Sequence, residues 1–209
     1  MTDRPLSAAD LALLDAARQG DPDAVRAALA AGADVEARDT EGRTALLRAA
    51  FADRVAAARL LVEAGADVNA QDPQLNSPWL VTGITGSVPM LRALLPGGPD
   101  LARRNRYGGV SVIPAAERGH VGYVRAVLAE TDIDVNHVND LGWTALLEAV
   151  LLGDGGPAHR EIVDLLLAHG ADPRLPDADG TTARAHAERR GFAELAAALR
   201  EAEDRTPGA

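Results

Sequence analysis

The sequence predicts an all-α fold, a solenoid of stacked helix–turn–helix pairs, from two motifs in phase and one feature of composition. The first motif, Gly-Ala-Asp, occurs at 32–34, 65–67 and 170–172, with a degraded copy at 98–100. Its first glycines recur at a constant interval of 33 residues, from 32 to 65 to 98. A fixed period of this length is typical of stacked supersecondary units rather than of one globular core.

The second motif, Thr-Ala-Leu-Leu, keeps the same phase. It occurs at 44–47 and 144–147, and less regular copies stand at 77–80 and 110–113. Each block begins with an acidic or amide residue three positions before a turn glycine or its replacement: Asp39, Asp72, Asn105, Asn139 and Asp177. Asp/Asn-x-x-Gly segments are typical of tight turns, so turns are expected to project between the helix pairs.

Composition fits thin layers rather than a thick core. Hydrophobic residues make up 47% of the chain, yet aromatic residues make up only 3%. Alanine and leucine fill a thin space between layers without large rings. Because one such unit cannot bury its own apolar face, stability is expected to come from the interfaces between neighbouring units.

Together these motifs resemble the ankyrin repeat, whose pattern is roughly D-x-x-G-x-T-P-L-H-x-A-A, a short helix and L-L-x-x-G-A-D-V-N. The resemblance implies a single ankyrin-repeat domain over 1–209, with β-hairpin-like projecting turns. Its expected parts are an N-terminal cap at 6–38, repeats at 39–71, 72–104, 105–138 and 139–176, a C-terminal cap at 177–203 and a tail at 204–209. The resemblance also implies a non-enzymatic module that binds proteins.

Individual residues support the predicted helix boundaries. Thr44 and Thr144 are expected to cap helices, because a threonine hydroxyl accepts a hydrogen bond from a free backbone N–H of the first turn. Pro78 is expected at the first helical position, where its missing N–H costs little. The glycines that follow Leu-Leu-x-x are expected to end helices in the left-handed conformation. The polar segment from Glu201 is expected to be frayed.

Repeat 72–104 departs most from the pattern. Leu75 replaces the turn glycine, Trp79 stands at a core leucine position, and Gly83 lies inside the first helix. A glycine within a helix costs about 0.5–1 kcal/mol relative to alanine, so this repeat is expected to be the least stable. Either Trp79 compensates by filling space, or the repeat is a hinge or groove. In the next repeat, Pro114 is expected to distort the start of its helix.

The largest insertion, 153–157, has the sequence Gly-Asp-Gly-Gly-Pro and predicts a loop between two helices. It is either a tolerated surface insertion or a specific contact loop. The histidine that the ankyrin pattern has after T-P-L is replaced by an aliphatic residue in every repeat, so the hydrogen bonds of the turns are expected to be made by other groups.

Charge and composition restrict the partners. The net charge is −10, which disfavours nucleic acid and anionic membranes. All 21 basic residues are arginine, a bias typical of GC-rich bacterial genomes, and the absence of cysteine excludes a disulfide framework. No signal-peptide pattern or membrane span of about 18 apolar residues is found. We therefore expect a bacterial, cytoplasmic and monomeric protein.

Catalytic motifs are not evident. The glycine-rich insertion lacks the lysine of a phosphate-binding loop, and the five histidines show no metal-binding spacing. We expect no cofactor and no metal. The alternative is a small-ligand binder or enzyme that uses the insertion in 139–176 together with His137, His159 or Glu148; His137 and His159 are expected to be less committed to structural roles than the other histidines.

The resemblance implies that partners bind a concave face formed by the projecting turns and the first helices. The positions that carry this role in the pattern give these candidates: Arg43, Phe51, Arg104, Arg106, Tyr107, Glu117, Arg118, Asp140, Leu141 and Trp143. Within them, Arg104, Arg106 and Tyr107 form a basic, aromatic-bearing turn with Arg103, and Trp143 lies on the next turn. Tyr, Trp and Arg are enriched among residues that dominate binding energy.

Two alternatives stay open for this cluster and for its function. Arg104 and Arg106 could instead pair with Asp100 and Asp140, and Trp143 could pack along the turns. The module could act as an adaptor, an inhibitor or an accessory protein. An accessory role in bacterial oxidative-stress defence, suggested by the family resemblance, is one specific version.

Overall fold

Twelve α-helices and one short 3-10 helix account for most of residues 5–205, the part of the chain that this computed structural model describes. The chain divides into two units, the first ending at Asp100 and the second beginning at Leu101. Each unit is described by itself below. The helices of the first unit are α1 (Ala8–Gln19), α2 (Pro22–Ala30), α3 (Ala45–Phe51), α4 (Val55–Glu63), α5 (Pro78–Thr85), α6 (Val88–Leu94) and the 3-10 helix η1 (Leu95–Gly97).

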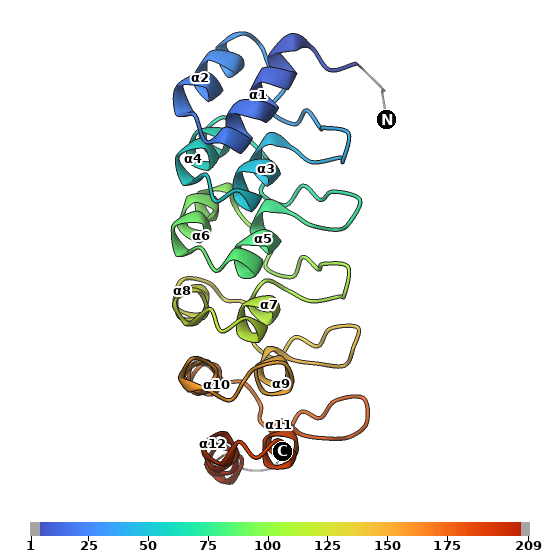
Figure 1. Cartoon of the computed structure of the whole chain (residues 1–209), viewed down its shortest axis with the longest axis vertical. Coiled ribbons are helices and arrows are strands. Elements are labelled where there is room, and N and C mark those ends of the chain that lie inside the picture. The colour runs from blue at the N-terminus through green and yellow to red at the C-terminus, as the bar shows by residue number, and fades with distance from the viewer. Residues whose placement is uncertain (1–4, 206–209) are drawn as a thin grey trace. The chain divides into compact units, whose positions relative to one another are not determined.

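In unit 1 the helices pack in pairs and the pairs stack. The first helices α1, α3 and α5 form one row beside the projecting turns, and α2, α4 and α6 form a second row (Figure 1). Small buried side chains such as Ala49, Ala50, Ala57 and Ala58 allow the helices to approach closely. Thin layers therefore need few large rings, as the composition predicts.

Unit 2 repeats this arrangement. Its helices are α7 (Val112–Glu117), α8 (Val121–Glu130), α9 (Ala145–Leu151), α10 (Pro157–Ala168), α11 (Ala183–Arg189) and α12 (Ala193–Arg205). Here α7, α9 and α11 lie beside the turns, and α8, α10 and α12 lie behind them (Figure 1). Within residues 5–205 extended structure is limited to two isolated antiparallel bridges, Arg38 with Thr44 and Pro176 with Thr182. The predicted all-α repeat solenoid is confirmed, whereas the repeat and cap boundaries stay predictions.

Hydroxyl side chains begin most of the first helices. Thr44 and Thr144 each accept a hydrogen bond from the backbone N–H three residues later, at 3.2 Å. Ser77 does the same for α5, with Pro78 at the first helical position. The threonine caps and the place of Pro78 were expected from the sequence, whereas the Ser77 cap was not. All three caps satisfy N–H groups that have no partner within the helix.

The start of α7 is distorted, as Pro114 predicts. Val110 stands at the position that corresponds to Thr44 and cannot cap, and its carbonyl accepts from the N–H of Ile113 at 3.1 Å. In α3 the corresponding carbonyl, that of Thr44, accepts from Arg48 four residues later. Since Pro114 has no N–H, the four-residue bond cannot form here, and a tighter three-residue turn replaces it.

Repeat 72–104 has two strained or unusual features. Leu75 occupies the turn position of glycine with φ +59°, a left-handed conformation that costs roughly 1–2 kcal/mol for a residue with a Cβ. Trp79 is fully buried at a position that corresponds to a core leucine, so it does fill space. The low stability of this repeat stays a prediction.

The C-terminal segment differs from expectation. We predicted fraying from Glu201, but α12 continues to Arg205. Glu203 explains part of the difference, because its carboxylate accepts from Arg184 of α11 at 2.7 Å and joins the end of α12 to the preceding helix. The remainder of the predicted tail, residues 206–209, lies outside the described residues.

Candidate functional site

Each projecting turn is built around one Asx side chain. In turn 39–43, Oδ1 of Asp39 accepts from the N–H groups of Glu41 and Arg43, both at 2.9 Å. The same oxygen of Asn139 accepts from Leu141 and Trp143, both at 3.0 Å. A single side chain thus satisfies two backbone donors at the tip and gives it one conformation.

A second contact links the Asx side chain to the helix that follows. Asp39 pairs with Arg48 (Nε to Oδ2, 3.6 Å), and Asp177 pairs with His186 (Nε2 to Oδ2, 2.6 Å). Arg48 and His186 both stand nine residues after their turn residue, one position beyond the histidine of the ankyrin pattern. In these two turns the adjacent position therefore contacts the Asx side chain in place of the missing histidine, through an ion pair from Arg48 and a hydrogen bond with His186.

In turn 139–143 the roles of the two side chains are exchanged, because the turn residue donates the hydrogen bond and the helix residue accepts it. Asn139 donates from Nδ2 to Oε1 of Glu148 at 2.8 Å, and Glu148 also stands nine residues after its turn residue. Glu148 is only 6% exposed. The pKa of Glu148 is raised from its ordinary 4.5 to about 7. Burial is the largest cause and the nearby carboxylate of Glu117 adds to it, while the hydrogen bond from Asn139 and the charge of Arg118 act in the opposite direction. The Asn139–Glu148 pair is a feature that sequence reasoning missed, and the nine-residue complementarity of the pairs was the signal for it.

The turns 105–109 and 139–143 are joined to each other in unit 2. The N–H of Asp140 donates to the carbonyl of Tyr107 at 2.9 Å, and Nε2 of His137 lies 2.7 Å from the carbonyl of Gly108. These bonds hold the two tips in register. The two tips are therefore adjacent and fixed to each other.

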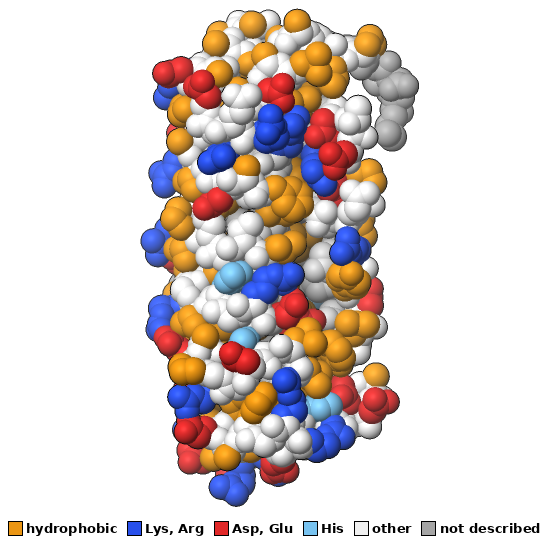
Figure 2. Space-filling view, in the orientation of Figure 1, with side chains coloured by type: hydrophobic (Ala, Val, Ile, Leu, Met, Phe, Trp, Pro, Cys, Tyr) orange, Lys and Arg blue, Asp and Glu red, His pale blue; other side chains and the backbone are white. Residues whose placement is uncertain are grey.

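Large side chains are exposed on these joined tips. Tyr107 is 52% exposed and Leu141 is 49% exposed, and Trp143 beside them is half-buried. The guanidinium of Arg106 lies over the ring of Tyr107, 4.8 Å from its centroid. Figure 2 shows hydrophobic side chains gathered on the side of unit 2 from which its turns project. We call Arg106, Tyr107, Asp140, Leu141 and Trp143 the turn surface.

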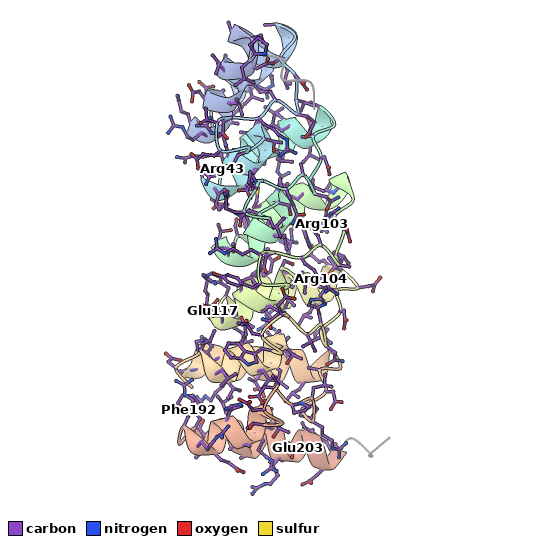
Figure 3. All side chains as sticks on the ribbon, turned by 90° about the vertical axis from the view of Figure 1, so that its right-hand side faces the viewer. Arg43, Arg103, Arg104, Glu117, Phe192 and Glu203 are labelled. Atoms are coloured by element: carbon purple, nitrogen blue, oxygen red, sulfur yellow. The ribbon has the colours of Figure 1, made fainter. Side chains whose placement is uncertain are left out.

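The other five candidates lie outside the turn surface, three of them in unit 2 and two in unit 1. Arg104 is exposed immediately before turn 105–109, and Glu117 and Arg118 pair with each other at the end of α7 (2.6 Å) (Figure 3). Arg43 and Phe51 belong to unit 1, where the guanidinium lies 5.1 Å from the ring centroid and contacts Glu41 at 2.8 Å. Unit 2 thus carries eight of the ten predicted residues, and the binding role of all ten stays a prediction.

The insertion 153–157 is fastened on two sides. His159, which is buried, has Nδ1 2.8 Å from Oδ1 of Asp154 and Nε2 3.0 Å from the carbonyl of Glu117. The hydrogen bond from the Gly156 N–H, and then that from His159, lower the pKa of the Asp154 carboxyl. On its other side the loop meets Phe192, because a Cβ added to Gly155 would lie 2.5 Å from that ring. Such contacts favour a structurally integrated insertion over a free contact loop.

Substituting Gly155 by alanine is expected to destabilise unit 2 by about 1–3 kcal/mol, because the added methyl collides with Phe192 and the backbone stays left-handed. Gly180→Ala is the matched control: its φ is also positive (+77°), but nothing lies within 4 Å of the added Cβ. Denaturant unfolding followed by circular dichroism measures both. Equal losses in the two variants would show that the Phe192 contact contributes nothing.

The residues of the alternative, enzymatic hypothesis each form a hydrogen bond with a different part of the repeat structure. His137 bonds to a carbonyl in turn 105–109, Glu148 bonds to Asn139, and His159 bonds to Asp154. The contacts of His137 and His159 correct our expectation that these two histidines are less committed to structural roles than the others. Two open grooves, of about 340 and 430 Å³, lie between α10 and α12 on the side away from the turns. Of the insertion, only Pro157 lines either groove.

Within residues 5–205 no helix has the length and apolar character needed to cross a membrane.

Stacked helix pairs, hydrogen-bonded projecting turns and an exposed aromatic surface define a helical-repeat protein. The particular family follows from sequence: a family model described as ankyrin repeats matches residues 4–72 and 80–177, and the chain belongs to the ankyrin repeat family. Members of this family are generally protein–protein interaction modules without enzymatic activity.

Three relatives illustrate the range. The ankyrin repeat protein YahD of Escherichia coli (strain K12) is 45% identical over 184 residues, which cover 88% of this chain and 92% of YahD. A crystal structure of an ankyrin repeat domain from Acinetobacter baumannii AYE is 48% identical, with a TM-score of 0.87, covering 91% of this chain and 96% of that one. Cyclin-dependent kinase 4 inhibitor B of Bos taurus is 34% identical over 96 residues, 46% of this chain and 68% of the inhibitor.

Proposed function

We propose that this protein is a non-enzymatic adaptor, inhibitor or accessory protein of the bacterial cytoplasm, and that it binds a protein partner through the turn surface of unit 2. The observation that carries the proposal is the exposure of Tyr107 and Leu141 on two tips that are hydrogen-bonded to each other. Side chains on a fixed backbone lose little conformational entropy when they bind, so rigid tips favour affinity.

The chemistry of the turn surface suits a protein partner. Tyr107 and Trp143 offer rigid apolar area, and the cation of Arg106 lies over the tyrosine ring and can pair with a partner carboxylate. Clustered Tyr, Trp and Arg are typical of residues that dominate binding energy. The similarity to an inhibitor of a cyclin-dependent kinase supports an inhibitory version of this role, in which the module binds an enzyme.

The experiment compares the wild-type protein with the triple variant Arg106→Ala, Tyr107→Ala and Trp143→Ala. Proteins captured from the source cytoplasm by the wild type are identified by mass spectrometry, and their affinities are measured by calorimetry. Truncation of dominant binding residues costs at least about 2 kcal/mol, so the variant is expected to lose about thirtyfold in affinity. Circular dichroism checks that the variant is folded.

The matched control is Arg125→Ala, Arg160→Ala and Glu161→Ala, which removes surface ion pairs from α8 and α10, behind the turns. Exposed ion pairs contribute little to stability, so this variant should be folded and should bind as the wild type does. If the folded turn-surface variant keeps its partners at unchanged affinity, the assignment of the surface is wrong. Equal loss of affinity in both variants would also contradict it.

A further inference from the structure

A chain of hydrogen bonds connects Glu148 to the tip of turn 139–143. Oε1 of Glu148 accepts from Nδ2 of Asn139 at 2.8 Å. The other end of that amide, Oδ1, accepts from the backbone N–H groups of Leu141 and Trp143, both at 3.0 Å. One amide group therefore lies between a buried carboxyl group and two residues of the turn surface.

Comparison with two other turns shows that the Asn139–Glu148 pair has an unusual distribution of charge. Asp39 and Asp177 are carboxylates that face Arg48 and His186, so in those turns the Asx side chain bears the negative charge and the helix supplies the donor. In turn 139–143 the Asx side chain is a neutral amide, and the helix supplies the acceptor. The backbone bonds at the tip are the same in all three turns. Only turn 139–143 of these three depends on an ionisable acceptor below the tip.

We propose that Glu148 regulates the turn surface of unit 2, and that turn 139–143 is held most firmly when the carboxyl group of Glu148 is ionised. The proposal rests on the proposed function for its biological meaning, because it concerns the same surface. It makes the geometry of Leu141 and Trp143 dependent on the protonation of a residue that is connected to their backbone N–H groups through Asn139.

The physical reason is the strength of the Asn139–Glu148 bond. A hydrogen bond to an ionised carboxylate is roughly twice as strong as one to a neutral acceptor. An amide whose N–H is bound to an anion is polarised, so its oxygen becomes a better acceptor for the N–H groups of Leu141 and Trp143. With a pKa of about 7, Glu148 changes its charge near neutral pH, where a small acidification would loosen the tip.

Each helix packed against α9 carries other charged or ionisable groups. Helix α7 brings Glu117 and Arg118, which have opposite effects on its pKa. Helix α10 brings His159, whose ring nitrogens face Asp154 and the carbonyl of Glu117. Helix α11 brings His186, bound to Asp177, and Arg190, which donates to the carbonyls of Val150 and Leu151. The test must therefore separate Glu148 from the other ionisable groups of these helices.

The experiment follows backbone amide resonances by NMR in the protein without any partner. The amide protons of Leu141 and Trp143 are expected to shift downfield as pH rises, with a midpoint near the pKa of Glu148, about 7. The amides of Glu41 and Arg43 serve as the internal control, because their acceptor Asp39 faces the permanent charge of Arg48. The carboxyl carbon of Glu148 reports its ionisation directly. Failure of Leu141 and Trp143 to follow that carbon overturns the proposal.

Glu148→Gln keeps an acceptor for Asn139 but cannot ionise, so the two tip amides should lose their midpoint near pH 7. A midpoint that persists in this variant belongs to a group other than Glu148 and overturns the proposal. The double variant Asn139→Asp with Glu148→Arg copies the Asp39–Arg48 pair of the same chain. It should keep the tip bonds and show no midpoint, and a midpoint there would equally contradict the proposal.

This test is independent of the proposed function, because no partner is present. If the tip amides titrate with Glu148 but the triple alanine variant binds its partners normally, the coupling stands and the binding surface is wrong. If the amides do not titrate while the triple variant loses its partners, the surface stands and the regulation by Glu148 is wrong.

Discussion

Replacing Trp79 by alanine is expected to destabilise the protein by about 3–5 kcal/mol, the range typical of removing a buried aromatic ring. Trp79 has no exposed surface, and it lies in α5 one residue after the helix-starting Pro78. Thin layers built from Ala and Leu have few large side chains that could move into the vacated space. Denaturant unfolding followed by far-UV circular dichroism measures the loss. A loss below about 1 kcal/mol would show that the layer closes over the cavity.

The matched variant Trp79→Phe separates ring volume from polarity. The indole Nε1 is buried without a hydrogen-bond partner among the described residues, and an unsatisfied buried donor costs about 1–3 kcal/mol. Phenylalanine removes that donor and keeps most of the ring, so the two effects should largely offset each other. We expect a net change within about 1 kcal/mol of the wild type. A loss as large as that of the alanine variant would mean that the indole shape itself is required.

Replacing Glu148 by glutamine is expected to increase stability at alkaline pH relative to the wild type. The folded-state pKa of Glu148, about 7, lies above its ordinary 4.5, so the native state binds more protons than the unfolded state between these values. Its contribution to stability is therefore complete below pH 4.5 and is lost as pH rises through about 7. One pKa unit corresponds to about 1.4 kcal/mol, which gives the variant a relative gain of roughly 2 kcal/mol from about pH 5 to about pH 8.

The measurement is the difference in unfolding free energy between variant and wild type over that pH range, so that histidine titrations common to both cancel. Glu63→Gln is the control, because Glu63 is an exposed glutamate at the end of α4. The change with pH should be larger for Glu148→Gln than for this control. A difference for Glu148→Gln that is flat with pH would show that the carboxyl is ionised in the native state throughout.

Part of the candidate site was predictable because it depends on local sequence. The Asp/Asn-x-x-Gly pattern predicts turns, and the Asx side chain that closes each turn lies within four residues of the N–H groups it accepts. Exposure of Tyr107 and Leu141 follows from their places at the tips. The bond from Asp140 to the Tyr107 carbonyl joins residues 33 positions apart, and only the stacking of repeats brings them together.

The insertion and the histidines show the same limit. The sequence of 153–157 predicts a loop, because its glycines and proline do not favour a continued helix. It does not distinguish a tolerated surface insertion from a specific contact loop. The contacts of the loop with His159 and Phe192 favour a structurally integrated insertion. These contacts depend on which groups the neighbouring repeats place beside the loop. Likewise His137 carries no local signal of its bond to the Gly108 carbonyl.

The sequence by itself determined the fold class and the helix starts, because a repeat of 33 residues, capping hydroxyls and turn glycines act over a few residues and recur in phase. It also supplied the complementary pairs that stand nine residues apart, though not their meaning. Only the tertiary structure decided that Glu148 is buried beside Glu117 with a pKa near 7, and that Asn139 connects it to the tip of its turn. Burial and charge proximity are sums over neighbouring repeats, and no local pattern encodes them.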